Sequence, residues 1–181
     1  MKKILKVDNP NVYAEYVGAP LLHPQLALIS YDEVSPLRSS MNNYGVYGLF
    51  IQKQFPKYLS YGTKSIVVGD SSIIAVAPGQ MGGAEDNGTP IFLNGWALLW
   101  SAELLKGSPL EGKMEEYHFF SYFDTDWLRM TASEYERFSL LLVTMRKEMQ
   151  ENPDSPALRN ILTSYLKLIL EYCQRIYLRQ R

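Results

Sequence analysis

Apolar runs of strand length, separated by turn residues, recur along the first 130 residues of the chain. Residues 73–77 (IIAVA) are β-branched or small and have the length of one buried strand. Gly69-Asp70 precedes this run as a turn, and Pro78-Gly79 ends it, because proline lacks the ladder N–H and glycine accepts positive φ. A second turn at 86–90, whose Asn-Gly pair suits a type I′ hairpin, precedes the apolar run 91–100. We therefore expect 73–77 and 91–100 to form a hairpin within an antiparallel barrel or sandwich.

The other strand-like segments are short and separated by Gly and Pro, a spacing typical of a sandwich or jelly roll. They are residues 25–31, 44–51, 58–61, 66–68 and 116–123, with a short helical piece at 102–105. The fold class that this pattern predicts is α+β, with an antiparallel cupin-like β-barrel or jelly roll followed by a C-terminal antiparallel helical pair.

The period-2 alternation of strands assigns the aromatic side chains to faces. One face of the segment 44–51 carries Tyr44, Val46 and Phe50, and the other carries Tyr47, Leu49 and Ile51. Trp96, Leu98 and Trp100 likewise share one face, and Arg38, Asn42 and Asn43 are expected near the barrel mouth. Such a barrel either fills with side chains or holds a small ligand, and a packed core explains these residues as well as a pocket does. The candidate ligand-binding residues are Arg38, Tyr44, Tyr47, Trp96 and Trp100.

From Thr131 the pattern changes to helices. Thr131 and Glu134 form a capping box for a helix that runs to about residue 150. Residues 152–156 (NPDSP) interrupt it, and a second helix runs from about residue 157 almost to the end. This second helix carries a heptad seam, which explains a dimer interface and an intramolecular pair about equally well. The seam consists of Leu158, Leu162, Tyr165, Ile169, Tyr172 and Ile176.

Length and composition indicate one domain, or one domain with an appendage, since the chain has 181 residues, of which 46% are hydrophobic. We expect an N-terminal arm or edge segment at 1–20, a barrel at 21–130 and a helical dimerisation subdomain at 131–181. The formal net charge of −1 provides no global field that would attract nucleic acid or an anionic membrane.

The compartment predicted by the sequence is the cytoplasm. The chain has one cysteine, Cys173, so it cannot form an internal disulfide. Lys6 and Asp8 interrupt the N-terminal apolar residues before they reach signal-peptide length, and no apolar run approaches the ~18 residues of a membrane span.

Candidate catalytic chemistry is sparse. The chain has two histidines, His23 and His118, and neither has a second histidine two residues away, so we expect no metal and no cofactor. Cys173 lies in the helical seam, where a thiol is unactivated. Residues 62–65 (GTKS) hint at a phosphate loop but lack its Gly-Lys-Ser order. The sequence therefore predicts no enzyme.

Several spaced motifs resemble the N-terminal domain of AraC-type transcriptional regulators. They are residues 22–26 (LHPQL), 44–50 (YGVYGLF), 77–80 (APGQ), 95–99 (GWALL), 119–122 (FFSY), the Thr131 capping box and 172–177 (YCQRIY). The resemblance covers about residues 20–181 and implies a cupin-like barrel that senses a small-molecule effector, followed by helices that form a homodimer. In that family a further C-terminal domain with helix-turn-helix units binds DNA. We expect this chain to be a fragment that lacks the DNA-binding domain.

The sequence is also compatible with two other functions. One is a stand-alone cupin-type binding protein or enzyme acting on a sugar or small acid, which would require a metal. The other is a protein–protein interaction domain that binds no small molecule.

Overall fold

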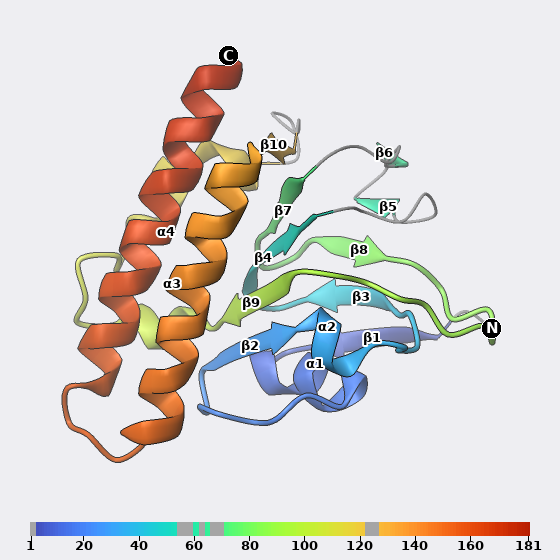
Figure 1. The fold of residues 1–181 in the computed structure, drawn as a ribbon, viewed down its shortest axis with the longest axis horizontal. Helices are drawn as coiled ribbons and strands as arrows, with labels where there is room; N and C mark the ends of the chain where they lie inside the picture. Colours follow the sequence, from blue (N-terminus) through green and yellow to red (C-terminus); the bar gives the residue numbers. More distant parts are fainter. Residues whose placement is uncertain (1–2, 54–59, 62–63, 66–70, 122–126) are drawn as a thin grey trace.

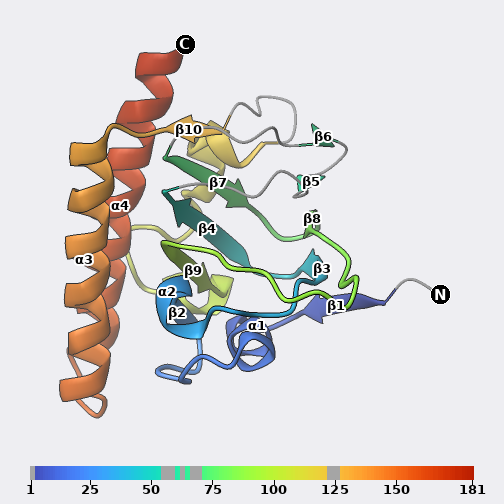
Figure 2. The ribbon, with the colours of Figure 1, turned by 45° about the vertical axis from the view of Figure 1, so that its right-hand side comes forward.

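Three layers make up the described part of the chain (Figures 1 and 2). The computed structural model describes residues 3–53, 60–61, 64–65, 71–121 and 127–181. Two long helices lie on one side, a sheet of buried strands lies in the middle, and a second sheet lies on the other side. The class is therefore α+β with two sheets, as the sequence predicts at this level. The predicted strand 66–68, the turn at Gly69-Asp70 and half of the GTKS motif lie outside the described residues.

The middle sheet, here called the central sheet, has the strand order β10-β7-β4-β9-β2 and is antiparallel throughout. Every residue of β2, β7 and β9 is buried, because other layers cover both faces of the sheet. These strands consequently appear in the sequence as continuous apolar runs without polar alternation. The strands are β2 (Leu26–Ser30), β4 (Tyr47–Gln52), β7 (Ser72–Val76), β9 (Trp96–Trp100) and β10 (Leu128–Arg129).

The second sheet, here called the outer sheet, has the order β1-β3-β8-β5-β6, with β1 parallel to β3 and the other pairs antiparallel. Residues 1–20 were expected to be an arm, but β1 pairs with β3 and the following helix, α1 (Pro10–Val17), packs on β2. Together they bury Val7, Tyr13 and Ala14. The strands are β1 (Ile4–Val7), β3 (Met41–Tyr44), β5 (Ser60–Tyr61), β6 (Lys64–Ser65) and β8 (Met81–Gly83).

The expected hairpin between 73–77 and 91–100 does not form. Both β7 and β9 pair with β4, which lies between them, and the chain crosses to β8 in the outer sheet after β7. The turn containing Gly88, whose φ is 86°, belongs to the long connection that returns to β9. Gly95 ends this connection at φ 102°, where a Cβ would lie 2.3 Å from the carbonyl oxygen of Ile51.

The described residues after β9, 101–121, form turns and 3-10 helices rather than a strand. The expected short helix at 102–105 is present as η1 (Ala102–Leu105). The expected strand 116–123 is wrong within the described residues, which form two 3-10 turns, η2 (Met114–Glu116) and η3 (His118–Phe120). Phe119 and Phe120 are buried against the central sheet and the helices, so the aromatic run fills a core instead of pairing as a strand.

The helical layer consists of α3 (Ala132–Glu151) and α4 (Leu158–Gln180), which lie side by side (Figures 1 and 2). The predicted capping box begins α3: the Glu134 N–H donates to Thr131 Oγ1, and the Thr131 N–H donates to Glu134 Oε1. A single turn, α2 (Tyr31–Val34), follows β2. None of the helices in the described part of the chain combines the length and the apolar character that crossing a bilayer requires.

Two cores occupy the two faces of the central sheet. Leu98, Ile51 and Ile169 belong to the core between the sheet and the helices. Phe50 and Leu99 belong to the core between the two sheets. Neighbouring residues of one strand therefore contribute to different cores, because successive side chains of a strand point to opposite faces.

Adjacent residues of α4 test how tightly the helical layer is packed. Ile169 is fully buried, whereas Leu168 is 40% exposed. We expect Ile169→Glu to lower the free energy of unfolding by roughly 3–5 kcal/mol, because it buries an unpaired charge. Leu168→Glu, the matched control in dilute protein, should change it by less than about 0.5 kcal/mol. Urea denaturation measures both, and equal effects would contradict this packing.

The capping box predicts a pH dependence of stability. The Arg179 guanidinium, which hydrogen-bonds Glu134, and the Thr131 N–H lower the pKa of Glu134 from 4.5 to about 2. A carboxyl whose pKa is lower in the folded state stabilises the protein above its unfolded pKa and loses this contribution as the pH falls. Glu134→Gln retains the capping-box geometry but lacks the charge. The stability difference between wild type and Glu134→Gln should be largest near neutral pH and shrink between about pH 4.5 and 2, as measured by urea midpoints.

Candidate functional site

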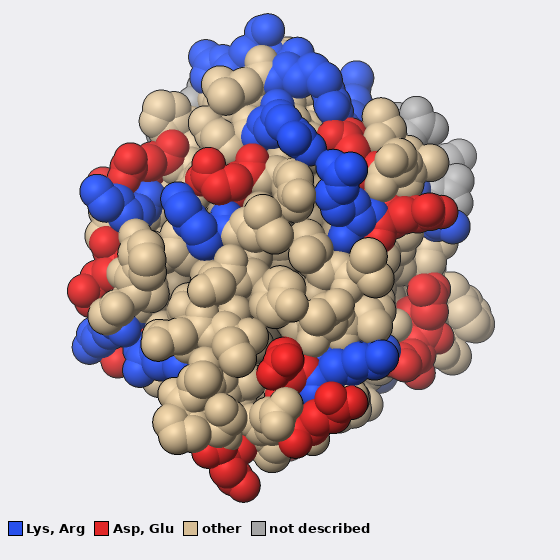
Figure 3. All heavy atoms as spheres, turned by 60° about the vertical axis from the view of Figure 1, so that its left-hand side comes forward, with Lys and Arg blue, Asp and Glu red and all other residues tan. Residues whose placement is uncertain are grey.

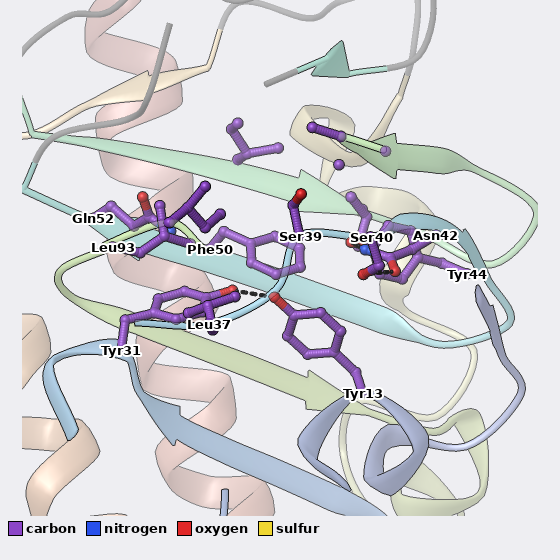
Figure 4. A pocket seen from close by; sticks show the side chains of 16 residues that line it. Tyr13, Tyr31, Leu37, Ser39, Ser40, Asn42, Tyr44, Phe50, Gln52 and Leu93 are labelled. Atoms are coloured by element: carbon purple, nitrogen blue, oxygen red, sulfur yellow. Dashed lines mark hydrogen bonds between the residues drawn. The ribbon is translucent and has the colours of Figure 1, made fainter. Parts of the chain in front are cut away.

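A cavity lies between the central and outer sheets, on the face of the central sheet opposite to α3 and α4 (Figure 4). The volume of this cavity is about 60 Å³. One part of its wall is apolar and is formed by Leu37, Phe50, Ile74, Val76, Ile91 and Leu93. The other part is polar and is formed by Tyr13, Tyr31, Ser39, Ser40, Asn42, Tyr44 and Gln52. We call this space the inter-sheet cavity.

Two tyrosines from α1 and α2 meet at one wall of the inter-sheet cavity (Figure 4). The hydroxyl groups of Tyr13 and Tyr31 lie 2.7 Å apart and share a hydrogen bond. Burial raises the pKa of Tyr13 to about 12, and it also raises the pKa of Tyr31. Both phenols are consequently neutral at physiological pH and present hydroxyl groups rather than charges.

A second polar group lies where β3 begins. Ser40 Oγ donates to Asn42 Oδ1 over 2.6 Å, and Asn42 Nδ2 donates to the Tyr44 hydroxyl over 2.9 Å. Asn42 and Tyr44 project from the same face of β3 because they are two residues apart. This chain of hydrogen bonds orients the polar groups at the end of the cavity that lies away from Gln52 (Figure 4).

Gln52 ends β4 with a buried amide whose oxygen lacks a partner. The residue is 1% exposed, and its Oε1 atom makes no hydrogen bond. It shares a strand face with Phe50, and both side chains line the cavity. Gln80, another buried glutamine, differs: its Oε1 accepts from the Ala77 N–H and its Nε2 donates to the Phe120 carbonyl. Because buried polar atoms are normally paired, the free Gln52 oxygen marks a position where a hydrogen-bond donor is missing.

The sequence-predicted ligand residues do not gather at this site. Tyr44 lines the inter-sheet cavity, but Tyr47, Trp96 and Trp100 lie on the helix-facing side of the central sheet. There Tyr47 stacks on Trp100 with ring centroids 5.8 Å apart, and Trp96 Nε1 donates to Ser139 Oγ over 3.2 Å. The alternation predicted which side chains share a face, but it could not show which face the helices cover.

Arg38 lies outside the cavity and is paired. Its side chain is 74% exposed and contacts Asp86 at 2.5 Å. The Gly88 N–H and the Arg38 guanidinium together lower the pKa of Asp86. Arg38 and Asp86 line a separate surface hollow that shares Ser39 and Ser40 with the cavity. The ion pair therefore stands beside the cavity wall instead of orienting a ligand inside it.

The predicted dimer-interface residues are mostly used within the chain. Leu158, Leu162, Ile169 and Ile176 are buried in the core between α3, α4 and the central sheet. Tyr165 and Tyr172 are half-buried at the edge of this core, and Tyr172 packs edge-to-face on Phe138 of α3. Only these two tyrosines of the predicted seam retain surface that another molecule can reach.

Apolar side chains and side chains with hydroxyl or amide groups line the cavity. Among the residues that the structure describes, its lining includes no histidine, cysteine, acid or base. The described residues also contain no group of three or more His, Cys, Asp or Glu side chains that could hold a metal ion. His23 Nδ1 accepts a hydrogen bond from the Gln25 N–H, and Cys173 is buried with a raised pKa.

Sequence reasoning missed Tyr13, Tyr31 and Gln52 as cavity residues. Gln52 carried a detectable signal, since it is a polar residue that ends an apolar strand on the same face as Phe50. Tyr13 and Tyr31 carried no signal in the sequence, because their place in the cavity depends on the packing of α1 against β2. That packing is a contact between segments separated along the chain.

The two buried glutamines should respond oppositely to replacement by an isosteric apolar residue. Gln80→Met leaves the Ala77 N–H and the Phe120 carbonyl without partners, so we expect a loss of roughly 1–3 kcal/mol. Gln52→Met breaks no hydrogen bond at Oε1, so it should be neutral within about 0.5 kcal/mol or stabilising. Thermal and urea unfolding compare them, and a large loss for Gln52→Met would assign that glutamine a structural role.

Comparison with known proteins adds no family assignment. No family model matches this chain, and no curated protein matches its sequence. Functional inference consequently rests on the geometry of the inter-sheet cavity, on the helical layer and on the sequence motifs described above.

Proposed function

We propose that this chain is the effector-binding and dimerisation region of a DNA-binding transcription regulator of the AraC type. The observation that carries the proposal is that the central sheet separates a cavity with both polar and apolar walls from a layer of two long helices. The spaced motifs that resemble this family provide the second support. In this proposal the two sheets form the cupin-like jelly roll of such regulators, DNA is bound by a domain outside this sequence, and the protein acts in the cytoplasm.

Strands β4 and β7 link the cavity to the helices. On β4, Phe50 and Gln52 line the cavity, while Leu49 and Ile51 pack in the core that includes α3 and α4. On β7, Ile74 lines the cavity, and its neighbours belong to the helix-facing core. A ligand that binds one position of these strands better than another would shift the helices that rest on their other face.

The outer side of the helical layer supports a dimer. Leu140 of α3 is 69% exposed and Leu168 of α4 is 40% exposed. Phe138 contacts Tyr172, so helix geometry in this antiparallel pair places Leu140 and Leu168 within a few ångströms of the same height. Figure 3 shows a broad area without charged side chains in the middle of this face. We define the outer helical face as Leu140, Leu141, Tyr165, Leu168 and Tyr172.

Charge along the outer helical face favours a second copy of this chain as its partner. The guanidinium groups of Arg137 and Arg175 both lie over the Tyr172 ring, toward the C-terminal end of α4. Glu148 and Glu151 occupy the last turn of α3, at the opposite end of the helical layer. A two-fold axis across the middle of the face would place the arginines of one protomer near the glutamates of its partner, while the apolar side chains pack between them.

The dimer is the part of the proposal that a single measurement tests. Leu140→Glu combined with Leu168→Glu places charges in the centre of the outer helical face, where burial without a partner is costly. We expect sedimentation velocity to show a dimer for the wild-type chain and at least a tenfold weaker association for this double variant. Phe92→Glu is the control, since Phe92 is an apolar residue, 75% exposed, outside the helices.

A wild-type chain that stays monomeric at high micromolar concentration would overturn the proposed dimerisation role. Association that both the double variant and Phe92→Glu leave unchanged would place the interface elsewhere. A stoichiometric metal ion in the purified protein would favour the cupin-type enzyme over the regulator.

A further inference from the structure

The inter-sheet cavity admits only a small molecule. Its volume is about 60 Å³. A space of this size holds a few water molecules, or a ligand with comparably few non-hydrogen atoms.

The wall of the cavity selects an uncharged molecule. Its described polar residues are hydroxyl and amide side chains, and none of them carries a charge. Tyr13 and Tyr31 remain neutral because burial raises the pKa of both phenols. An ion that enters would leave water without gaining a counter-charge, which is far more costly than the transfer of a neutral molecule.

Gln52 determines which polar group the ligand must offer. Its Oε1 atom is buried and unpaired, so it can only gain from a molecule that donates an N–H or O–H. The polar groups around Asn42 lie at the other end of the cavity and are already bonded to one another. The apolar side chains of Phe50 and Ile74 lie in the wall as well, where they favour a compact hydrocarbon part.

We propose that the inter-sheet cavity binds a small uncharged molecule that donates a hydrogen bond to Gln52 Oε1. Small primary amides and small diols have this chemistry. The inference rests on the proposed function, because it specifies the chemistry of the effector. Binding energy is limited per non-hydrogen atom, so a four-atom molecule such as acetamide binds no more tightly than roughly tens of micromolar, and binding must be measured at micromolar to millimolar concentrations.

Three probe ligands of nearly equal shape separate the effect of ligand charge on binding from the effect of ligand size. Acetamide is neutral and donates N–H groups, acetate is an anion without a donor, and acetamidinium is a cation with donors. Methyl NMR titrations follow Ile74 and Val76 in the cavity wall, with Leu162 in the helix-facing core as an internal reference. We expect acetamide to shift the cavity methyl signals, with affinities for acetate and acetamidinium at least tenfold weaker. Adding 1,2-ethanediol distinguishes an O–H donor from the amide N–H donor.

Substitution of Gln52 tests the proposed contact. Gln52→Met and Gln52→Leu should each weaken acetamide binding about tenfold, and thermal unfolding verifies that both variants fold. Gln174→Met is the matched control, because Gln174 also has a buried Oε1 without a partner but lies on α4, outside the cavity lining. Its acetamide affinity should equal that of the wild type.

Three results would each overturn this inference: no shift of cavity signals with any probe at 100 mM, equal binding of acetamide and its charged analogues, or unchanged binding after both Gln52 substitutions. Failure of the proposed function appears in a different measurement. A monomeric chain that binds acetamide through Gln52 would retain this inference and lose the dimerisation role. A chain that forms a dimer but does not bind the probes would retain the dimerisation role and lose this inference.

Discussion

Both faces of the central sheet must be covered, and the rest of the structure depends on this constraint. Every residue of strands β2, β7 and β9 is buried, and most of these residues are apolar. The helices α3 and α4 cover one face, and the outer sheet with α1 covers the other. Removing either layer would expose a continuous apolar surface, so the helical layer is integral to the fold rather than an appendage to a barrel.

The same constraint creates the connection on which the proposed regulation relies. Phe50 and Ile51 are adjacent in β4, yet one lines the inter-sheet cavity and the other packs in the helix-facing core. Closely packed interiors transmit displacement, because few voids can absorb it. In the proposed regulation, a molecule in the cavity would act on the helices through the thickness of a single strand.

The cavity and the outer helical face are two of the places where the structure departs from local rules. Gln52 buries an amide oxygen without a partner, whereas Gln80, equally polar, has both amide ends bonded. Leu140 and Leu168 leave apolar surface on a helical layer whose other face is tightly packed. Such departures are expected at functional sites, which is why the ligand and the second copy are proposed at these positions.

Local chemistry in the sequence determined α3 and α4, the capping box at Thr131, the positions of β2, β4, β7 and β9, and the residues that share each strand face. These features depend on periodicity and on side chains close together in the chain. Tertiary structure decided that β4 separates β7 from β9, that residues 4–17 belong to the fold, and that Trp96 and Trp100 face the helices. It also decided that Tyr13, Tyr31 and Gln52 line one cavity. A strand with two apolar faces does not encode which layer covers which face, because that choice depends on contacts between segments far apart in sequence.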